Sequence, residues 1–459
     1  MNALPCWIQY GTNEQNVKFV KEKLVPALSL NIKCWMGGLP DYKQYVKKHF
    51  PEMNYYSQTQ FNQLADVQSG YDDDFFELYD RSFVYELDNI FRRFKFDYNY
   101  ETPFDEQNHC LLVARSLLAR LKEDKVKLVI FFEYPHAVGS YLTYLVCKFL
   151  GIKVIIRTLS PFESRTFYVE NLDEGIPMHY QEMNDDQRED FEKVLLKATR
   201  SYSEAQPEYT RKQNQRYFLV SRLRKFAVFM DQQRWKRALR SLVDTSFVPP
   251  KGKFVYVGLH YQPELTSFPL GGFYNNQYLM ILMLSSVVPD DWKIIVKEHP
   301  SIFRYVKKNV TLYRSAQYYA SIKNIPKVEL VDFTHDSFGL IDASACIATL
   351  TGTIGFEGVL RGKPCLVFGQ ASYVGCEGVN KVASYRELKQ AFDELIESNF
   401  HVDKNKVLEF ATRAISNTVR SKTNRDYDKF DEEQHLDFIT NIFNSQQRQT
   451  QDESARLHL

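Results

Sequence analysis

The feature that most constrains the fold is the alternation of short apolar runs with helical segments in the second half of the chain. The runs are rich in aliphatic and β-branched residues, and segments with helical spacing of their apolar residues separate them. Strands that alternate with helices in this way form a parallel, doubly wound sheet. The pattern therefore predicts an α/β domain with strands at residues 254–259, 292–297, 327–332, 345–350 and 363–369.

A second α/β domain is predicted in the first half. Residues 127–132 (KLVIFF) and 153–159 (KVIIRTL) have the composition of strands, and the helical segment between them ends at Gly151. A chain of 459 residues exceeds the size at which one hydrophobic core usually stops growing, so two domains with a cleft between them are expected. A turn at Val248-Pro249-Pro250 marks the boundary. The predicted division is 1–247, 248–445 and a polar, disordered tail at 446–459.

Composition excludes several classes of function. The 58 Lys and Arg balance 57 Asp and Glu, so the net charge of +1 gives no reason to expect nucleic acid as a partner. The seven cysteines lack Cys-x-x-Cys spacing, which favours reduced thiols in a cytoplasmic protein. The N-terminus has no export signal, and no apolar stretch reaches the roughly 20 residues that span a bilayer. Any membrane contact is therefore expected to be peripheral, at the inner face of the membrane.

One segment has a strong local charge. Residues 183–242 are predicted to be helical, and residues 207–240 hold ten Lys or Arg against two acids. Such a cationic face suits an anionic membrane or a polyanionic glycan. A solvated helical face near the domain boundary explains the same residues, so both interpretations stay open.

The strongest candidate site lies in the run WKIIVKEHP. Ligands bind beyond the carboxyl ends of parallel strands, and Pro300 cannot extend a strand, so Lys297, Glu298 and His299 are expected at that edge. There Lys297 and His299 can meet a diphosphate or phosphodiester, and His299 can donate a hydrogen bond or a proton as charge develops on a leaving phosphate. The alternative is a strand-end histidine that pairs only with backbone.

A second candidate site is the turn Thr351-Gly352-Thr353, which joins a predicted strand to a predicted helix. Hydroxyls, a glycine and backbone N–H groups at a helix N-terminus form a cradle for anions. Glu357 is predicted on the first turn of this helix, where its carboxylate can accept ribose hydroxyls or cap the helix. Small residues at such a turn also simply allow a helix to pack closely on a sheet.

The polar stretch from Gly258 to Gln277 supplies a third group of candidates. A long loop inside a compact domain is usually functional. We expect its side chains at the ligand site or in the cleft, and the ligand-binding candidates are His260, Glu264 and Gln277.

In the first domain, Glu133 and His136 directly follow the predicted strand at 127–132. A carboxylate at this edge can accept the proton of an attacking hydroxyl or stabilise an oxocarbenium ion. The alternative is a helix-capping glutamate beside a structural histidine. Glu163 and Arg165 are weaker candidates for contact with an acceptor.

The run Asp72-Asp73-Asp74 has the composition of a metal-binding Asp-x-Asp turn. It precedes an aromatic helical stretch instead of closing an apolar strand, so it is predicted to begin a helix. No metal and no other cofactor is expected.

Three motifs together resemble a known family. The combination of LHYQPE, VKEHP and TGTIGFEGVLRGKPCLVFG is similar to the capsule and surface-polysaccharide biosynthesis transferases, a GT-B group that includes Kdo transferases with CMP-activated donors. The resemblance covers roughly residues 254–382 well and the first domain only loosely. It implies a GT-B fold, in which two Rossmann-like doubly wound α/β domains face a cleft. It also implies that His299-Pro300 and Thr351-Gly352-Thr353 hold the nucleotide phosphate.

The resemblance predicts a glycosyltransferase that moves a sugar from a nucleotide-activated donor to a growing capsular polysaccharide or glycolipid. The His-Pro pair favours a CMP-sugar, whereas a glutamate at the position of Glu357 is also found in UDP- and GDP-sugar enzymes. Three alternatives stay open: a teichoic-type alditol-phosphate transferase, a nucleotide-sugar 2-epimerase and a non-catalytic glycan-binding subunit.

Overall fold

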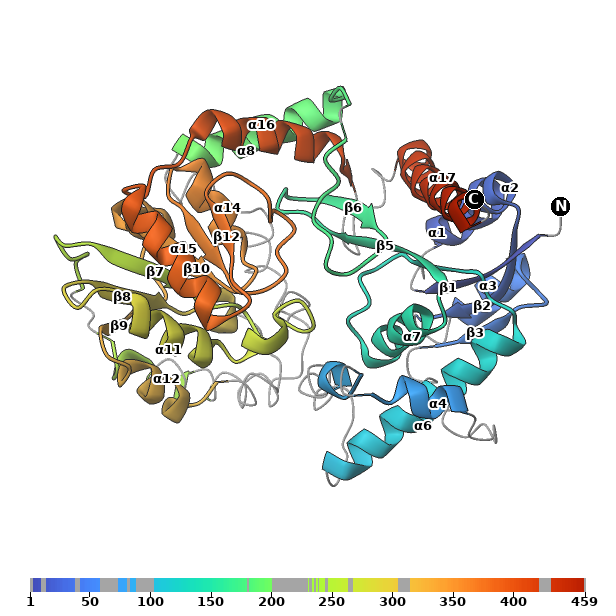
Figure 1. Cartoon of the computed structure of the whole chain (residues 1–459), viewed down its shortest axis with the longest axis horizontal. Helices are drawn as coiled ribbons and strands as arrows, with labels where there is room; N and C mark the ends of the chain where they lie inside the picture. Colours follow the sequence, from blue (N-terminus) through green and yellow to red (C-terminus); the bar gives the residue numbers. More distant parts are fainter. Residues whose placement is uncertain are drawn as a thin grey trace. The chain divides into compact units, whose positions relative to one another are not determined.

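The computed structural model describes residues 3–9, 14–37, 42–57, 73–80, 83–87, 103–179, 181–199, 230, 233–234, 237, 239–243, 247–262, 267–303, 314–420 and 431–457. The chain divides into two compact units (Figure 1). The first unit comprises residues 1–160, 164–177 and 418–459, and the second comprises residues 161–163 and 178–417.

The first unit is built on a seven-stranded sheet with the order β13-β6-β5-β4-β1-β2-β3. Its strands β1 to β5 pair in parallel, whereas β6 pairs antiparallel with both β5 and β13. The strands are β1 (Leu4–Gln9), β2 (Leu30–Met36), β3 (Asn54–Tyr56), β4 (Leu128–Phe131), β5 (Lys153–Leu159), β6 (Arg165–Val169) and β13 (Val419–Arg420).

The helices of the first unit pack on both the parallel strands and each other. They include α1 (Glu14–Phe19), which continues through a π-helical turn (Val20–Leu24) into α2 (Val25–Leu28), then α3 (Tyr42–His49), α4 (Asp73–Leu78), α6 (Pro103–Glu123), α7 (Val138–Phe149) and α17 (Glu432–Leu457). All four residues of β4 are buried, as expected for a central parallel strand covered on both faces. The predicted strand-helix-strand unit is β4, α7 and β5, and this prediction is confirmed.

The second unit is built on a six-stranded parallel sheet with the order β12-β11-β10-β7-β8-β9. Its strands are β7 (Phe254–Gly258), β8 (Lys293–Lys297), β9 (Val328–Val331), β10 (Cys346–Thr349), β11 (Cys365–Val367) and β12 (Val379–Lys381). The first five are the predicted strands. The predicted α/β class with two Rossmann-like, doubly wound domains, as found in GT-B proteins, is therefore confirmed for each unit by itself.

The helices of the second unit include α8 (Asp185–Thr199), α11 (Gln277–Val287), α12 (Ala316–Lys323), α13 (Ser337–Ala343), α14 (Thr353–Leu360), α15 (Tyr385–Glu397) and α16 (Lys404–Ser416), with short 3-10 turns at Gly272–Asn275 and Pro300–Phe303. Helices α11 to α14 connect strands of the second sheet, whereas α8 precedes β7, and α15 and α16 follow β12. Side-chain caps begin several of them, and the Ser315 and Asp336 side chains accept backbone N–H groups of α12 and α13. The core between helices and sheet contains Val257, Ile294 and Leu350.

The domain boundary predicted at residue 247 is wrong. Helix α8 packs against α14 and α16, so residues 178–247 belong to the second unit. The boundary was misplaced because apolar periodicity identifies a helix but not the sheet on which the helix packs. Pro249-Pro250 does not separate two units, since it precedes strand β7 inside the second unit. Most of the basic stretch at 207–240 lies outside the described residues. Of its described members, Arg240 pairs with Asp332 at 3.5 Å.

The chain returns to the first unit after residue 417, which the sequence did not predict. The fully buried Arg165 side chain of β6 donates from Nε to the Thr418 hydroxyl at 2.7 Å and from Nη2 to the Thr418 carbonyl at 2.9 Å. Arg165 therefore anchors the returning strand and is not available to an acceptor.

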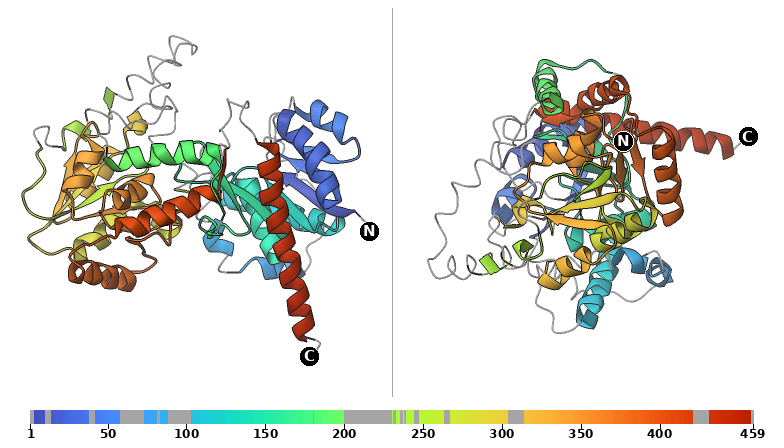
Figure 2. Two further views of the ribbon diagram at one scale, coloured as in Figure 1. Left: turned by 90° about the horizontal axis from the view of Figure 1, so that it is seen from above. Right: turned by 90° about the vertical axis from the view of Figure 1, so that its left-hand side faces the viewer.

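The tail predicted to be disordered is the end of a helix. Helix α17 begins after Asp431, whose carboxylate accepts the Gln434 backbone N–H at 3.0 Å, and it continues to Leu457. Residues 446–457 are polar, which favours disorder, but they are also rich in strong helix formers such as Gln, Glu, Arg and Ala, and Figure 2 shows them as part of one continuous helix. Within the described residues, no helix is long and apolar enough to cross a membrane.

A buried histidine links α17 to the first sheet and predicts a pH dependence of stability. The Tyr168 hydroxyl lies 2.7 Å from Nδ1 of His435, and Nε2 lies 3.3 Å from the Arg420 carbonyl, which fits a neutral ring protonated at Nε2. Burial, and then the charge of Arg157, hold the pKa of His435 well below 6.5. Below pH 6.5 the His435 ring is protonated in the unfolded chain but stays neutral in the folded chain. The free energy of unfolding therefore falls as the pH falls.

We expect the free energy of unfolding to fall by up to about 1.4 kcal/mol per pH unit below this value because of His435 alone. Urea unfolding of the wild type and His435→Gln at pH 7 and pH 5 measures this effect. The variant should lose less stability between the two pH values. Equal losses would show that His435 does not carry the dependence.

Candidate functional site

The candidate residues of the second unit gather where the strand order reverses. Strands β7, β8 and β9 follow one another across the sheet, and β10 then pairs on the opposite side of β7. In open α/β sheets, ligands bind at such a switch point, beyond the carboxyl ends of the strands. His260 follows β7, His299 follows β8, and the turn Thr351-Gly352-Thr353 follows β10.

His260 is a neutral, buried member of this group. Its Nε2 lies 3.2 Å from the Thr351 hydroxyl, and its backbone N–H donates to Oε1 of Gln277 at 2.7 Å. Burial, and then the positive charge of Arg314, lower the pKa of His260 to about 4. At neutral pH this ring can therefore exchange hydrogen bonds but carries no charge for a phosphate.

Gly352 allows the strand-to-helix turn to approach His260. It occupies the N-cap position of α14, and its carbonyl accepts the Tyr373 hydroxyl. A Cβ atom at Gly352 would lie 2.8 Å from the Thr349 hydroxyl and 3.1 Å from Cε1 of His260. Thr351 is buried beside this contact and Thr353, the first residue of α14, is exposed.

Gly352→Ala should therefore disturb the site more than the fold. We expect a loss of about 1–3 kcal/mol in the free energy of unfolding, typical of overpacking, together with weaker nucleotide binding because Thr349 and His260 must move. Gly252→Ala is the matched control, since its new Cβ would meet nothing within 4 Å. Chemical denaturation and nucleotide titration of both variants test this. Wild-type nucleotide affinity in Gly352→Ala would contradict it.

Lys297 is more deeply placed than the sequence predicted. Its side chain is buried, and Nζ donates to the Ser337 hydroxyl at the start of α13. Burial lowers its pKa to about 8, although the nearby carboxylates of Asp336, Asp332 and Glu357 favour its charge. Lys297 therefore links β8 to α13 through a hydrogen bond. Its positive charge is balanced by the neighbouring carboxylates.

Glu357 lies on the second turn of α14, not on the first as predicted, because the helix begins at Thr353. Its carboxylate pairs with Lys197 of α8 at 3.5 Å. Arg361, one turn further along, donates to the Lys197 carbonyl at 3.0 Å. A role for Glu357 toward ribose hydroxyls stays a prediction.

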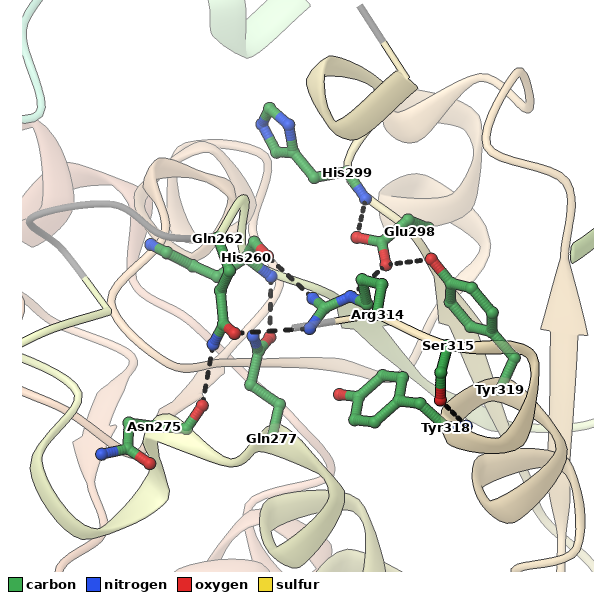
Figure 3. A network of polar contacts seen from close by, with 10 residues as sticks. All are labelled: His260, Gln262, Asn275, Gln277, Glu298, His299, Arg314, Ser315, Tyr318 and Tyr319. Carbon is green, nitrogen blue, oxygen red and sulfur yellow. Dashed lines mark hydrogen bonds and ion pairs between the residues drawn. The ribbon is translucent and has the colours of Figure 1, made fainter. Parts of the chain in front are cut away.

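A buried ion pair at this site was missed by sequence reasoning (Figure 3). The Arg314 Nε donates to Oε2 of Glu298 at 2.6 Å, and both side chains are 1% exposed. Oε2 also accepts the Tyr319 hydroxyl at 2.9 Å, and Oε1 accepts the His299 backbone N–H at 2.7 Å. Glu298 lies between the candidates Lys297 and His299, which indicates a place at the same edge of the sheet. No spacing rule, however, predicts that Arg314 is its partner.

The His299 side chain projects away from this ion pair (Figure 3). It is partly buried, and its ring centre lies 6.1 Å from that of Tyr261. Pro300 begins the 3-10 turn that follows. Gln277, the first residue of α11, is buried and holds His260 as described above. Glu264 lies outside the described residues.

Residues 185–401 match the family model described as "Capsule polysaccharide biosynthesis protein". This segment is similar to the capsule polysaccharide biosynthesis protein family. This capsule-biosynthesis segment (residues 185–401) contains the whole second sheet and every described donor-binding candidate. Glu163, an exposed residue of the second unit, lies outside it. No relative was found among curated protein sequences.

Solved structures similar to the chain include two transferase domains and an epimerase. The beta Kdo 2,7 transferase of Thermosulfurimonas dismutans KpsC is 12% identical with a TM-score of 0.31, covering 78% of this chain and 96% of that one. The beta Kdo 2,4 transferase of the same protein is 14% identical with a TM-score of 0.30, covering 63% and 79%. The UDP-GlcNAc 2-epimerase of Neisseria meningitidis is 13% identical with a TM-score of 0.26, covering 90% and 98%.

The candidates of the first unit lie outside the capsule-biosynthesis segment. Glu133 and His136 occupy the loop between β4 and α7, beyond the carboxyl end of β4, where the first sheet reverses its strand order between β4 and β1. Glu133 is partly buried, and burial raises its pKa while Arg157 opposes the shift. Nδ1 of His136 lies 2.7 Å from the Tyr134 carbonyl. As predicted, Asp73 begins a helix, α4, and Asp74 pairs with Lys122.

Proposed function

We propose that the chain is a glycosyltransferase of capsular or surface polysaccharide synthesis, with the donor nucleotide bound by the second unit. The observation that carries this proposal is that His260, His299 and the Thr351-Gly352-Thr353 turn follow three neighbouring strands of a parallel sheet, at the edge where its strand order reverses. These residues lie in the capsule-biosynthesis segment. Together they offer imidazole, hydroxyl and backbone groups suited to a nucleotide phosphate.

Within this proposal His299 acts on the leaving phosphate. Its ring projects away from the buried ion pair, while the backbone of the same residue is held by Glu298. A hydrogen bond or proton from His299 would stabilise the negative charge that develops as the glycosidic bond to phosphate breaks. Glu133 of the first unit is the proposed base for the acceptor hydroxyl, and His136 a second group in the same loop.

The proposed donor is a CMP-sugar, and the proposed acceptor is a growing polysaccharide or glycolipid at the cytoplasmic side of the membrane. The His299-Pro300 pair supports the choice of donor by the resemblance described above. We further propose that transfer requires no metal, because the acidic run at Asp73 begins a helix and does not close a strand. Transfer should then persist in excess EDTA.

A thermal-shift panel with CMP, CDP, UDP and GDP tests the proposed donor site. A ligand at 100 times its dissociation constant stabilises the folded state by about 2.7 kcal/mol, which raises the melting temperature by a few degrees. We expect CMP to give the largest shift and His299→Ala to abolish it. Stabilisation by none of the four nucleotides would exclude a nucleotide site and favour a glycan-binding role.

A further inference from the structure

The loops that carry His260 and His299 leave neighbouring strands, and one buried ion pair contacts both of them. Strand β7 pairs with β8 in register from Phe254↔Lys293 to Gly258↔Lys297, so the two loops begin at the same edge of the sheet. Arg314 reaches this edge from the residue before the cap of α12. Its guanidinium stacks 4.7 Å above the ring of Tyr318.

Each end of the ion pair contacts a different loop (Figure 3). On the His260 side, Arg314 Nη2 donates to the His260 carbonyl at 3.0 Å, and Nη1 lies 3.5 Å from Oε1 of Gln262. On the His299 side, Glu298 Oε1 accepts the His299 backbone N–H at 2.7 Å. The pair therefore bridges the backbones of the two histidines through charged hydrogen bonds.

Stability alone does not explain such a pair. Removing two charges from water is costly, and apolar residues of similar volume often replace a buried ion pair without loss of stability. What an apolar pair cannot supply is the directional hydrogen bonding that fixes two loop backbones relative to each other. A phosphate subsite made from two loops depends on that geometry, because small displacements of positioned groups lower binding and catalysis strongly.

We propose that Glu298 and Arg314 are positioning residues that set the spacing of His260 and His299 in the phosphate subsite. The Tyr319 hydroxyl, which donates to Glu298 Oε2 at 2.9 Å, supports the carboxylate in the same role. This inference rests on the proposed function in one respect only, namely that the group bound near His260 and His299 is a phosphate.

The test compares two double variants, each of which removes an ion pair at one end of β8. Glu298→Leu with Arg314→Met replaces the buried pair beyond the carboxyl end of β8. Lys293→Met with Glu329→Leu replaces a half-exposed pair, 3.0 Å apart, whose Lys293 begins β8 and whose Glu329 lies on β9. We expect both to unfold within a few degrees of the wild type. Only the buried-pair variant should bind CMP, CDP, UDP or GDP at least tenfold more weakly.

Hydrogen exchange supplies a readout that needs no ligand. The His299 amide should exchange at least tenfold faster in the buried-pair variant, whereas Glu298→Gln keeps an acceptor oxygen and should restore most of its protection. Wild-type nucleotide affinity and wild-type exchange in a folded buried-pair variant would overturn the inference. If that variant does not fold, Tyr319→Phe replaces it, with a several-fold loss of affinity expected and an unchanged affinity counting against the inference.

The same readouts separate this inference from the proposed function. If the wild type binds none of the four nucleotides, the proposed function fails. The exchange of the His299 amide still decides whether the ion pair holds the loop.

Discussion

Replacing His299 with alanine is expected to lower the rate of sugar transfer by about two orders of magnitude or more, the usual effect of losing a positioned acid. The ring projects away from the buried Glu298 and Arg314 side chains, and the contact that holds the loop uses the His299 backbone N–H. Alanine keeps that N–H. The variant should therefore unfold near the wild-type temperature, and steady-state transfer assays should show the loss in kcat/KM.

His401→Ala is the matched control for this prediction. His401 lies in the second unit and is exposed, so its removal should change neither transfer nor melting temperature. A rate of transfer by His299→Ala close to that of the wild type would show that His299 takes no part in the reaction. A melting temperature lowered by ten degrees or more would instead assign His299 a structural role.

The second unit was the more predictable half of the molecule, for a physical reason. A parallel strand buried on both faces must be continuously apolar, so β7, β8 and β10 stand out against the polar segments around them. The polar residues that directly follow such strands must lie at the carboxyl edge of the sheet. The sequence alone therefore predicts the position of His299 and of the turn at Gly352.

The parts that sequence reasoning missed depend on contacts between distant positions. Arg314 meets Glu298 only because the chain returns to the same edge after β8, and neither residue type predicts its partner. Arg165 and Thr418 are likewise distant in the sequence, so the anchor of the returning strand leaves no local pattern. Glu357 was misplaced by one turn because a glycine-rich helix start gives no sharp signal for its first residue.

Glu133 tests the other half of the proposed reaction, since it belongs to the unit that does not hold the donor candidates. Burial raises the pKa of its carboxyl above the ordinary value, which makes its ionised form a stronger base. Glu133→Gln removes the base and keeps the size and most hydrogen bonds of the side chain. We expect transfer to fall by about 10²–10⁴-fold, while nucleotide affinity, measured by titration, stays at the wild-type value.

The pH profile distinguishes a base from a residue that only binds the acceptor. A base must be ionised to act, so wild-type transfer should rise with pH as the Glu133 carboxyl loses its proton, and the residual transfer of Glu133→Gln should lack this rise. Glu77→Gln, at an exposed position of α4, is the control and should keep the wild-type profile. A Glu133→Gln variant with the wild-type profile at reduced rate would assign the proton transfer to another group. His136 in the same loop would then be the next residue to substitute.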